Sequence, residues 1–116
     1  MNPVKKTINE TAEGIKFRDG EHLWFWFLNQ KRIFAGFGMP HAHNRHAITP
    51  LDIETLITRL YLAGRLTDAM LSVMQEFGAR RRAPNQHVYA ENKSAALWND
   101  AMAKIESAAR ERGWME

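Results

Sequence analysis

Residues 49–78 have the sequence TPLDIETLITRLYLAGRLTDAMLSVMQEFG, and this stretch decides the fold. Thr49 and Asp52 have the spacing of a capping box, in which each side chain accepts a hydrogen bond from a backbone N–H at the start of a helix. Pro50 suits the first helical position, because a proline lacks an N–H that would find no partner there. The apolar residues that follow at helical spacing are Ile53, Leu56, Ile57, Leu60 and Tyr61. They predict a helix that ends at Gly64.

A second helix is expected directly after the first. Thr67 or Asp68 supplies its N-cap, and Gly78 is its expected stop signal. Its apolar stripe consists of Met70, Val73, Met74 and Phe77. Only residues 64–66 separate the two helices, and two short helices joined by a tight turn with glycine are typical of a helix-turn-helix. The sequence therefore predicts a helix-turn-helix-like pair.

The segment from Glu21 to Phe37 is compatible with two interpretations. Its aromatic run, residues 23–28, favours a strand. Its length without a turn signal favours a helix, as does Asp19, a suitable N-cap. On a helix, one face would carry Leu23, Phe27, Gln30 and Phe34. We favour the helix.

The remaining segments complete an all-α fold. A last helix is expected from about Ser94 to Arg112, with Gly113 after it. Its apolar stripe consists of Trp98, Ala101, Met102, Ile105 and Ala109. Residues 1–18 have few large apolar side chains and are predicted to form a flexible N-terminal arm. The sequence thus predicts one small four-helix domain over residues 19–116.

The composition excludes several classes of protein. The chain has 116 residues, no cysteine and a longest apolar run of six residues, so disulfides, thiolate metal sites and membrane spans are excluded. The first residues lack the apolar stretch of a signal peptide, and we expect a cytoplasmic protein without a membrane partner. No phosphate-binding glycine loop or nucleophile motif is present, so neither an enzyme nor a bound cofactor is expected.

The positive charge is concentrated in two segments. The net charge is +3, but residues 29–48 contain three basic residues and no acidic one, and residues 78–93 contain four basic residues and one acidic one. The basic residues are Lys31, Arg32 and Arg45 in the first segment and Arg80, Arg81, Arg82 and Lys93 in the second. Clustered cations raise the local potential and favour a polyanionic partner.

Nucleic acid is the partner that these segments favour, with DNA preferred over RNA. Arginine contacts phosphates and guanine, and amide side chains recognise adenine. The expected binding residues are Arg80, Arg81, Arg82, Asn85 and Gln86, with backbone contacts from Lys31, Arg32 and Arg45. The helix before them offers Ser72 and Gln75 as base readers, but its acidic residues disfavour a role in a DNA groove. A solvated loop is the alternative for the three consecutive arginines.

The aromatic run suggests a second function. On a helix, consecutive residues are about 100° apart, so Trp24, Phe25, Trp26 and Phe27 cannot all face one core. Exposed members, above all Trp24, Phe25 and Trp26, would serve as anchors for a protein partner or a homodimer. Stacking on single-stranded bases is a competing role. A core that surrounds the segment on all sides is the structural alternative.

Three histidines, His41, His43 and His46, are weak candidates for metal ligands. Their spacing matches neither a zinc-protease helix nor a zinc finger, and no acid lies close in sequence. A solvated loop without metal is the favoured interpretation.

Two stretches, HLWFWF at residues 22–27 and TPLDI at residues 49–53, together with LYLAGRLT at residues 60–67, resemble a group of short, uncharacterised bacterial proteins. The resemblance covers roughly residues 22–112 and implies a single helical domain. It transfers no activity. The leading expectation is therefore a non-enzymatic protein of transcription regulation that binds DNA through its arginine-rich loop, and the alternative is a protein-interaction module.

Overall fold

The computed structural model describes residues 16–37 and 48–116. In these ranges the chain forms four α-helices and one short 3-10 helix, which confirms the predicted all-α class. The elements are α2 (Gly20–Phe37), α3 (Pro50–Leu62), α4 (Asp68–Arg80), η1 (Tyr89–Glu91) and α5 (Asn92–Glu111).

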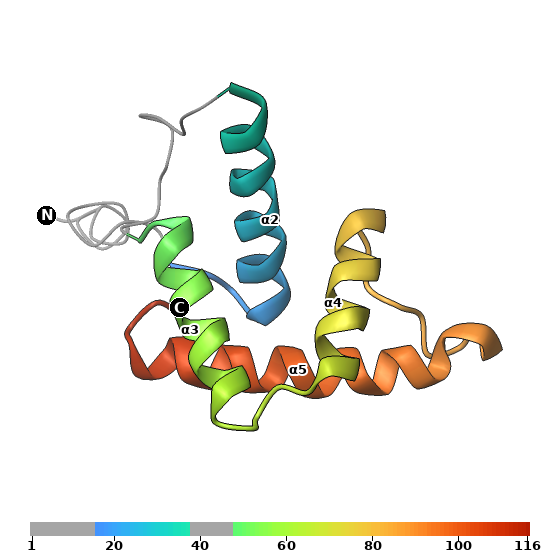
Figure 1. The fold of residues 1–116 in the computed structure, drawn as a ribbon. Helices are drawn as coiled ribbons and strands as arrows, with labels where there is room; N and C mark the ends of the chain where they lie inside the picture. The colour runs from blue at the N-terminus through green and yellow to red at the C-terminus, as the bar shows by residue number, and fades with distance from the viewer. Residues whose placement is uncertain (1–15, 38–47) are drawn as a thin grey trace, which may run out of the picture.

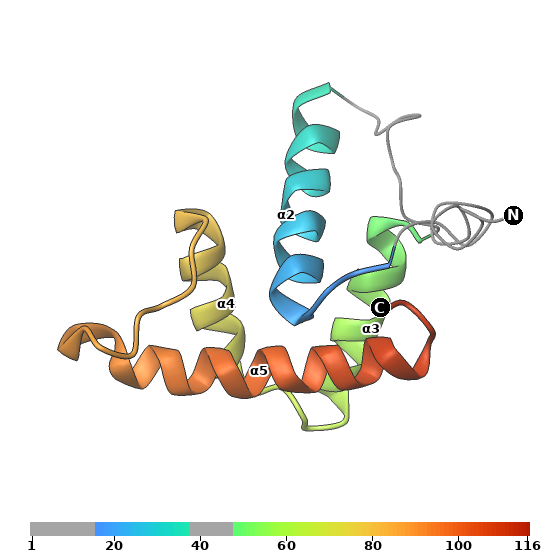
Figure 2. The ribbon, with the colours of Figure 1, turned by 180° about the vertical axis from the view of Figure 1, so that it is seen from behind.

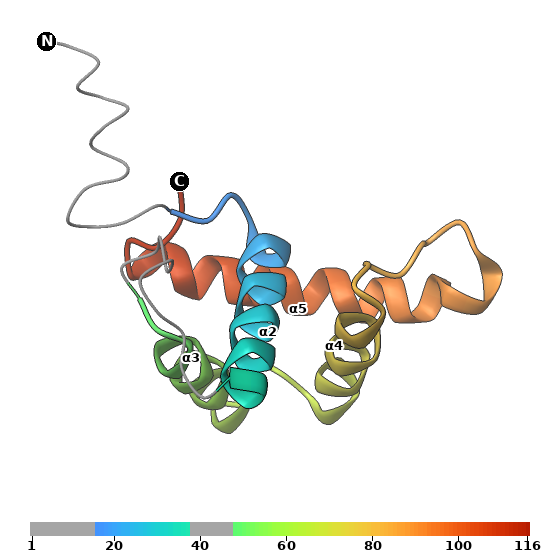
Figure 3. The same cartoon turned by 90° about the horizontal axis from the view of Figure 1, so that it is seen from above.

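The long helix α5 is the base on which the other three helices stand (Figure 1). The view from behind shows α2, α3 and α4 rising from the same side of α5 (Figure 2). Seen from above, α2 lies between α3 and α4 (Figure 3). The helices α2 and α4 both begin near α5 and run away from it, so their C-terminal ends lie on the same side of the molecule.

The predicted helix-turn-helix unit is not confirmed. The helices α3 and α4 follow each other after a short turn, but no Cα atom of α3 lies within 8 Å of one of α4. Near the turn, the Tyr61 hydroxyl of α3 donates a 2.8 Å hydrogen bond to Asp68 of α4. Because α2 occupies the space between them, each helix packs on α2 and α5 instead.

The helix starts follow the sequence signals closely. Thr49 and Asp52 form the predicted capping box, with Pro50 in the first turn. Thr67 caps α4 by accepting a hydrogen bond from the Met70 N–H. These caps satisfy N–H groups that have no partner within the helix.

The predicted end of α4 at Gly78 is wrong, because the helix continues to Arg80. A Cβ at Gly78 would lie 2.4 Å from Leu28 Cδ1 and 3.2 Å from Trp24 Nε1. The missing side chain at Gly78 therefore leaves space that the α2 side chains fill, and the left-handed turn that ends α4 falls on Arg81 instead.

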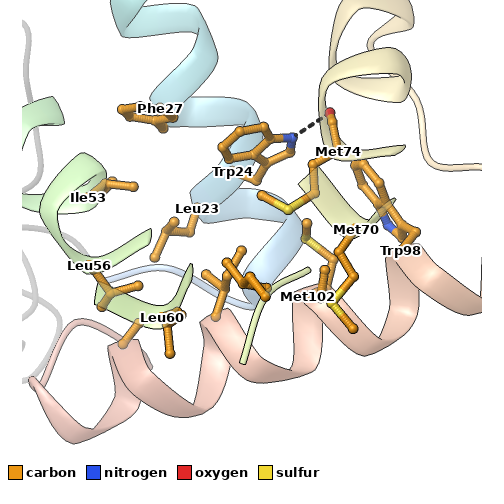
Figure 4. Packing of buried hydrophobic residues seen from close by; sticks show 14 of the residues in the cluster. Leu23, Trp24, Phe27, Ile53, Leu56, Leu60, Met70, Met74, Trp98 and Met102 are labelled. Atoms are coloured by element: carbon orange, nitrogen blue, oxygen red, sulfur yellow. Dashed lines mark hydrogen bonds between the residues drawn. The ribbon is translucent and has the colours of Figure 1, made fainter. Parts of the chain in front are cut away.

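The segment with the aromatic run is a helix, as favoured above. Asp19 is its N-cap, since its carboxylate accepts a 2.8 Å hydrogen bond from the His22 N–H. Leu23, Trp24 and Phe27 are buried and face α3, α4 and the core (Figure 4). The indole N–H of Trp24 donates to the Met74 carbonyl at 3.1 Å and so joins α2 to α4.

The core lies where α2, α3 and α4 pack against α5. Trp98 is fully buried and its indole N–H donates to the Glu21 carboxylate at 2.8 Å. The predicted stripe of α5 is confirmed, because all of its members are buried: Trp98, Ala101, Met102, Ile105 and Ala109. Gly113 follows with a positive φ of 78°.

The predicted arm, residues 1–18, includes one residue of the core. Phe17 is 1% exposed and forms a β-bridge with Met115, which joins the two ends of the described chain. The Phe17 N–H donates to the Trp114 carbonyl at 2.9 Å, and the Glu116 N–H donates to Phe17 at 2.8 Å. The packed body therefore includes Phe17, and residues 1–15 lie outside the described ranges.

Candidate functional site

A cleft of about 670 Å³ opens between α2 and α4. Its volume falls in the range of small-ligand sites, roughly 300–1,000 Å³. The apolar part of its lining consists of Phe25, Leu28, Gly78 and Ala79. Two helix faces that are distant in sequence thus form one concave surface.

The polar part of the lining is cationic. It consists of Asn29 and Arg32 on α2, Gln75 on α4 and Arg81 at the end of α4. None of the described residues that line the cleft is acidic. Among the described residues, the Arg32 guanidinium has one hydrogen bond, to the Asn29 amide oxygen at 3.1 Å, and the Arg81 guanidinium has no hydrogen bond or ion pair. Two guanidinium groups without a carboxylate partner make the cleft suitable for an anion.

The approach of α2 to α4 depends on small and interlocking side chains. Gly78 lets Leu28 and Trp24 come against the backbone of α4. The bond from Trp24 to the Met74 carbonyl fixes the distance between the helices one turn earlier. The cleft lies beside this contact, on the part of α2 that carries Asn29 and Arg32.

Arg81 has an unusual backbone conformation for a side chain of its size. Its φ is 59° and its ψ is 33°, in the left-handed region where glycine is the common residue. The Arg81 N–H donates to the Gly78 carbonyl at 3.1 Å, and the Arg82 N–H donates to the Phe77 carbonyl at 3.2 Å. These bonds close α4 and direct the chain into the loop.

Replacing Arg81 with glycine should therefore leave the stability unchanged or raise it. A non-glycine residue in this region destabilises the folded state by roughly 1–2 kcal/mol. Glycine removes this strain, but its greater conformational freedom in the unfolded chain offsets part of the gain. We expect a gain of up to about 1 kcal/mol in the free energy of unfolding, measured by urea denaturation. Arg81→Ala is the control, because it removes the guanidinium and keeps the strain. A loss of stability in Arg81→Gly would mean that the guanidinium stabilises the fold.

Arg80 and Arg82, the neighbours of Arg81, are used within the fold. Arg82 binds Glu91 through two hydrogen bonds, of 2.9 and 2.6 Å, and Arg80 pairs with Glu76 at 3.0 Å. Both guanidinium groups also lie over the ring of Phe77, with distances of 4.8 Å for Arg80 and 5.3 Å for Arg82. Arg80 and Arg82 are thus paired with carboxylates, whereas the Arg81 guanidinium has no acidic partner among the described residues.

Glu91 holds the loop after α4 in place. It accepts hydrogen bonds from Arg82 and from the Asn85 N–H, the latter at 2.8 Å. The hydrogen bonds from Arg82 first, and then from the Asn85 backbone, lower the pKa of Glu91 from 4.5 to about 2. The same contact raises the pKa of Arg82.

This lowered pKa makes the contribution of Glu91 to stability depend on pH. The unfolded chain takes up the proton near pH 4.5 and the folded chain near pH 2, so the contribution is complete above 4.5 and is lost as the pH falls toward 2. We expect Glu91→Gln to be less stable than wild type at neutral pH and equal to it at the acid end. Chemical denaturation across this pH range measures both. Glu54→Gln, which removes an exposed carboxylate on α3, is the matched control. A stability difference between Glu91→Gln and the wild type that stays constant with pH would contradict this explanation.

The other predicted nucleic-acid residues do not join the cleft. The ammonium of Lys31 lies over the ring of Phe27, at 5.3 Å. Phe27 itself lies on the side of α2 that faces α3 (Figure 4). Asn85 uses its side-chain oxygen to accept a 2.8 Å hydrogen bond from the His87 N–H. Gln86 is exposed on the loop. Arg45 lies outside the described residues.

Most of the aromatic run packs into the core, as in the alternative in which the core surrounds this segment. Trp24 is 5% exposed and cannot anchor a partner. Phe25 and Trp26 are half-buried: the ring of Phe25 lies 5.7 Å from that of Trp98, and the ring of Trp26 lies 5.4 Å from that of Phe17. The predicted interface of Trp24, Phe25 and Trp26 is therefore not an exposed aromatic patch, and Phe25 contributes to the cleft instead.

The histidine candidates for a metal site, His41, His43 and His46, lie outside the described residues. Within the described residues, no group of three or more histidine or acidic side chains is arranged to hold a metal ion.

Asn29 and the apolar lining residues other than Phe25 were not predicted as site residues from the sequence. A signal was present, because residues 25, 28, 29 and 32 share one helical stripe and residues 75, 78 and 79 share another. The pattern does not reveal which stripe faces which, since that depends on the insertion of α2 between α3 and α4. Gln75 was considered only as a reader in a helix-turn-helix, a unit that the structure does not form.

No protein-family profile, curated protein or solved structure matches this chain. The site must therefore be interpreted from its own chemistry. In the described ranges, no helix combines the length and the apolar character that crossing a bilayer requires.

Proposed function

We propose that this protein is a non-enzymatic regulatory protein that binds nucleic acid, DNA in preference to RNA, at the cleft between α2 and α4. The observation that carries the proposal is the position of Arg32 and Arg81. They come from two separate basic segments, line the same cleft and have no acidic neighbour in it. Guanidinium groups in such a position suit phosphate oxygens, which they contact through paired N–H donors.

The chemistry of the lining favours binding over catalysis. Its polar side chains are two guanidinium groups and two amides, none of which transfers protons near neutral pH. In the part of the chain that the structure describes, no hydroxyl, thiol, carboxylate or imidazole lines the cleft. The proposed binding site is therefore smaller than the arginine-rich loop expected from the sequence. It includes Arg81 of that loop and Arg32 of α2.

The test is a titration of fluorescein-labelled DNA, followed by anisotropy, at several salt concentrations. Each lost phosphate contact lowers the slope of log affinity against log salt by about 0.7 for a single strand or about 0.9 for a duplex. The double variant Arg32→Ala/Arg81→Ala should therefore bind more weakly and show a slope lower by about 1.4–1.8.

The matched control is the double variant Arg59→Ala/Arg65→Ala. It removes the same charge from α3 and the turn after it, outside the cleft, where both residues are exposed. We expect its affinity and salt slope to stay close to those of the wild type. Equal losses in the two double variants would assign binding to net charge alone, and absence of DNA binding by the wild type at low salt would refute the proposal.

The alternative function, a protein-interaction or dimerisation module built on exposed aromatics, has less support. Trp24 is buried, and Phe25 and Trp26 pack against the core. A concentration-dependent mass in sedimentation experiments that Trp26→Ala abolishes, with DNA affinity unchanged, would favour that alternative.

A further inference from the structure

The shape of the cleft distinguishes between two kinds of nucleic acid. Sequence readers of duplex DNA insert a convex element, such as a helix, into the major groove. The candidate site is concave instead: it is a cleft of about 670 Å³, and Arg32 and Arg81 are among its lining residues. A base in a duplex is stacked and paired and cannot enter such a hollow, whereas a base of a single strand can.

The apolar wall offers a surface for a planar group. Phe25 lines the cleft, and its ring lies 5.7 Å from the ring of Trp98, at an interplanar angle of 35°. Trp98 is itself fixed by complete burial and by its 2.8 Å bond to Glu21. The Phe25 ring is thus held by the core, so binding a planar partner would cost little side-chain entropy.

The opposite wall completes a slot for a base. Ala79 carries only a methyl group and is exposed, and Leu28 covers Gly78, so α4 contributes little side-chain bulk to this side of the cleft. Asn29 and Gln75 add one amide from each helix, and amides match the donor and acceptor pattern of base edges. An apolar slot with amides and two guanidinium groups has the components that one nucleotide requires.

We infer that the cleft binds single-stranded nucleic acid by stacking one unstacked base on Phe25, on the side of the cleft that Ala79 also lines, while Arg32 and Arg81 bind phosphates of the same strand. This inference rests on the proposed function and specifies its substrate. A nucleoside monophosphate has the same base but a single phosphate, whereas a strand offers each of the two guanidinium groups a phosphate of its own.

The test compares a labelled single strand of about 12 nucleotides, a typical site size for such proteins, with the duplex of the same sequence. We expect the wild type to bind the single strand at least tenfold more tightly. Phe25→Leu keeps apolar bulk but removes the ring, and should weaken single-strand binding about tenfold, as for the loss of one stacked base. Ala79→Leu fills the slot from an exposed helical position and should have an equal or larger effect.

Each variant is first compared with the wild type by circular dichroism and thermal unfolding, and Ala79→Leu provides the test if Phe25→Leu does not fold. Equal affinity for single strand and duplex, together with unchanged binding by Ala79→Leu, would overturn the inference and leave the proposed function intact. Binding of adenosine monophosphate as tight as that of the strand would also overturn it. Absence of binding to either DNA would refute the proposed function itself.

Discussion

Replacement of Trp98 by alanine is expected to lower the free energy of unfolding by about 3–5 kcal/mol, the range found for large aromatic truncations in a core. Trp98 is fully buried on α5, and its ring supports Phe25 of α2. Its indole N–H also gives Glu21 a hydrogen bond at the start of α2. The truncation therefore leaves a cavity and removes the contact that joins α5 to the first turn of α2.

Chemical denaturation of three variants separates these contributions. Trp98→Phe keeps most of the apolar volume but cannot donate to Glu21, so it should cost less than Trp98→Ala. Tyr89→Ala is the control, because Tyr89 is 90% exposed and its loss should change stability little. A loss below about 1 kcal/mol in the free energy of unfolding of Trp98→Ala would mean that the surrounding residues close the space left by Trp98 and that this residue contributes little to the packing on α5.

The elements that could be predicted are those whose signals are local. The capping box of Thr49 and Asp52 acts over one helical turn, and the apolar stripe of α5 depends only on helical period. Gly64 and Gly113 adopt the positive φ expected after a helix. Such features involve neighbours in sequence, so the sequence suffices to predict them.

The features that could not be predicted depend on contacts between helices. Gly78, like Gly64, follows an apolar helical stripe and so resembles a helix stop signal. In the structure, however, α2 packs on Gly78, and α4 continues beyond it to Arg80. Likewise, α3 and α4 have the short connection of a helix-turn-helix, yet α2 separates them. Nothing in residues 49–78 alone reports on the presence of α2.

The candidate site shows the same division. The two basic segments were visible in the sequence, and one member of each lines the cleft, namely Arg32 and Arg81. Which arginine of three stays unpaired could not be predicted, because it depends on where Glu76 and Glu91 lie. Consecutive residues at the end of a helix point in different directions, so Arg80 and Arg82 meet these acids while Arg81 lines the cleft.

The second large effect is expected at the contact between α2 and α5. Gly20 is buried at the start of α2, where its N–H donates to Glu106 at 3.1 Å. A Cβ at this position would lie 2.5 Å from the carbonyl oxygen of Met102 and 3.2 Å from its carbonyl carbon. Both atoms belong to the backbone of α5, so no side-chain rotation relieves the contact. We expect Gly20→Ala to cost about 1–3 kcal/mol, as in other overpacked sites, although alanine is the better helix former.

Gly78→Ala is the informative comparison for Gly20→Ala, since its added Cβ would come as close, 2.4 Å, to a different kind of atom. That atom is the terminal Cδ1 of Leu28, which can move with its side chain at small cost. Chemical denaturation should therefore show a loss in Gly20→Ala and a change near zero in Gly78→Ala, where the gain of about 1 kcal/mol in helix propensity offsets the repacking. Equal losses in both would mean that the α2–α4 contact is as rigid as the α2–α5 contact. Gly20 is not among the described residues that line the cleft, but α2 forms one of its walls. If the added Cβ shifts α2 on α5, Gly20→Ala should therefore also weaken DNA binding.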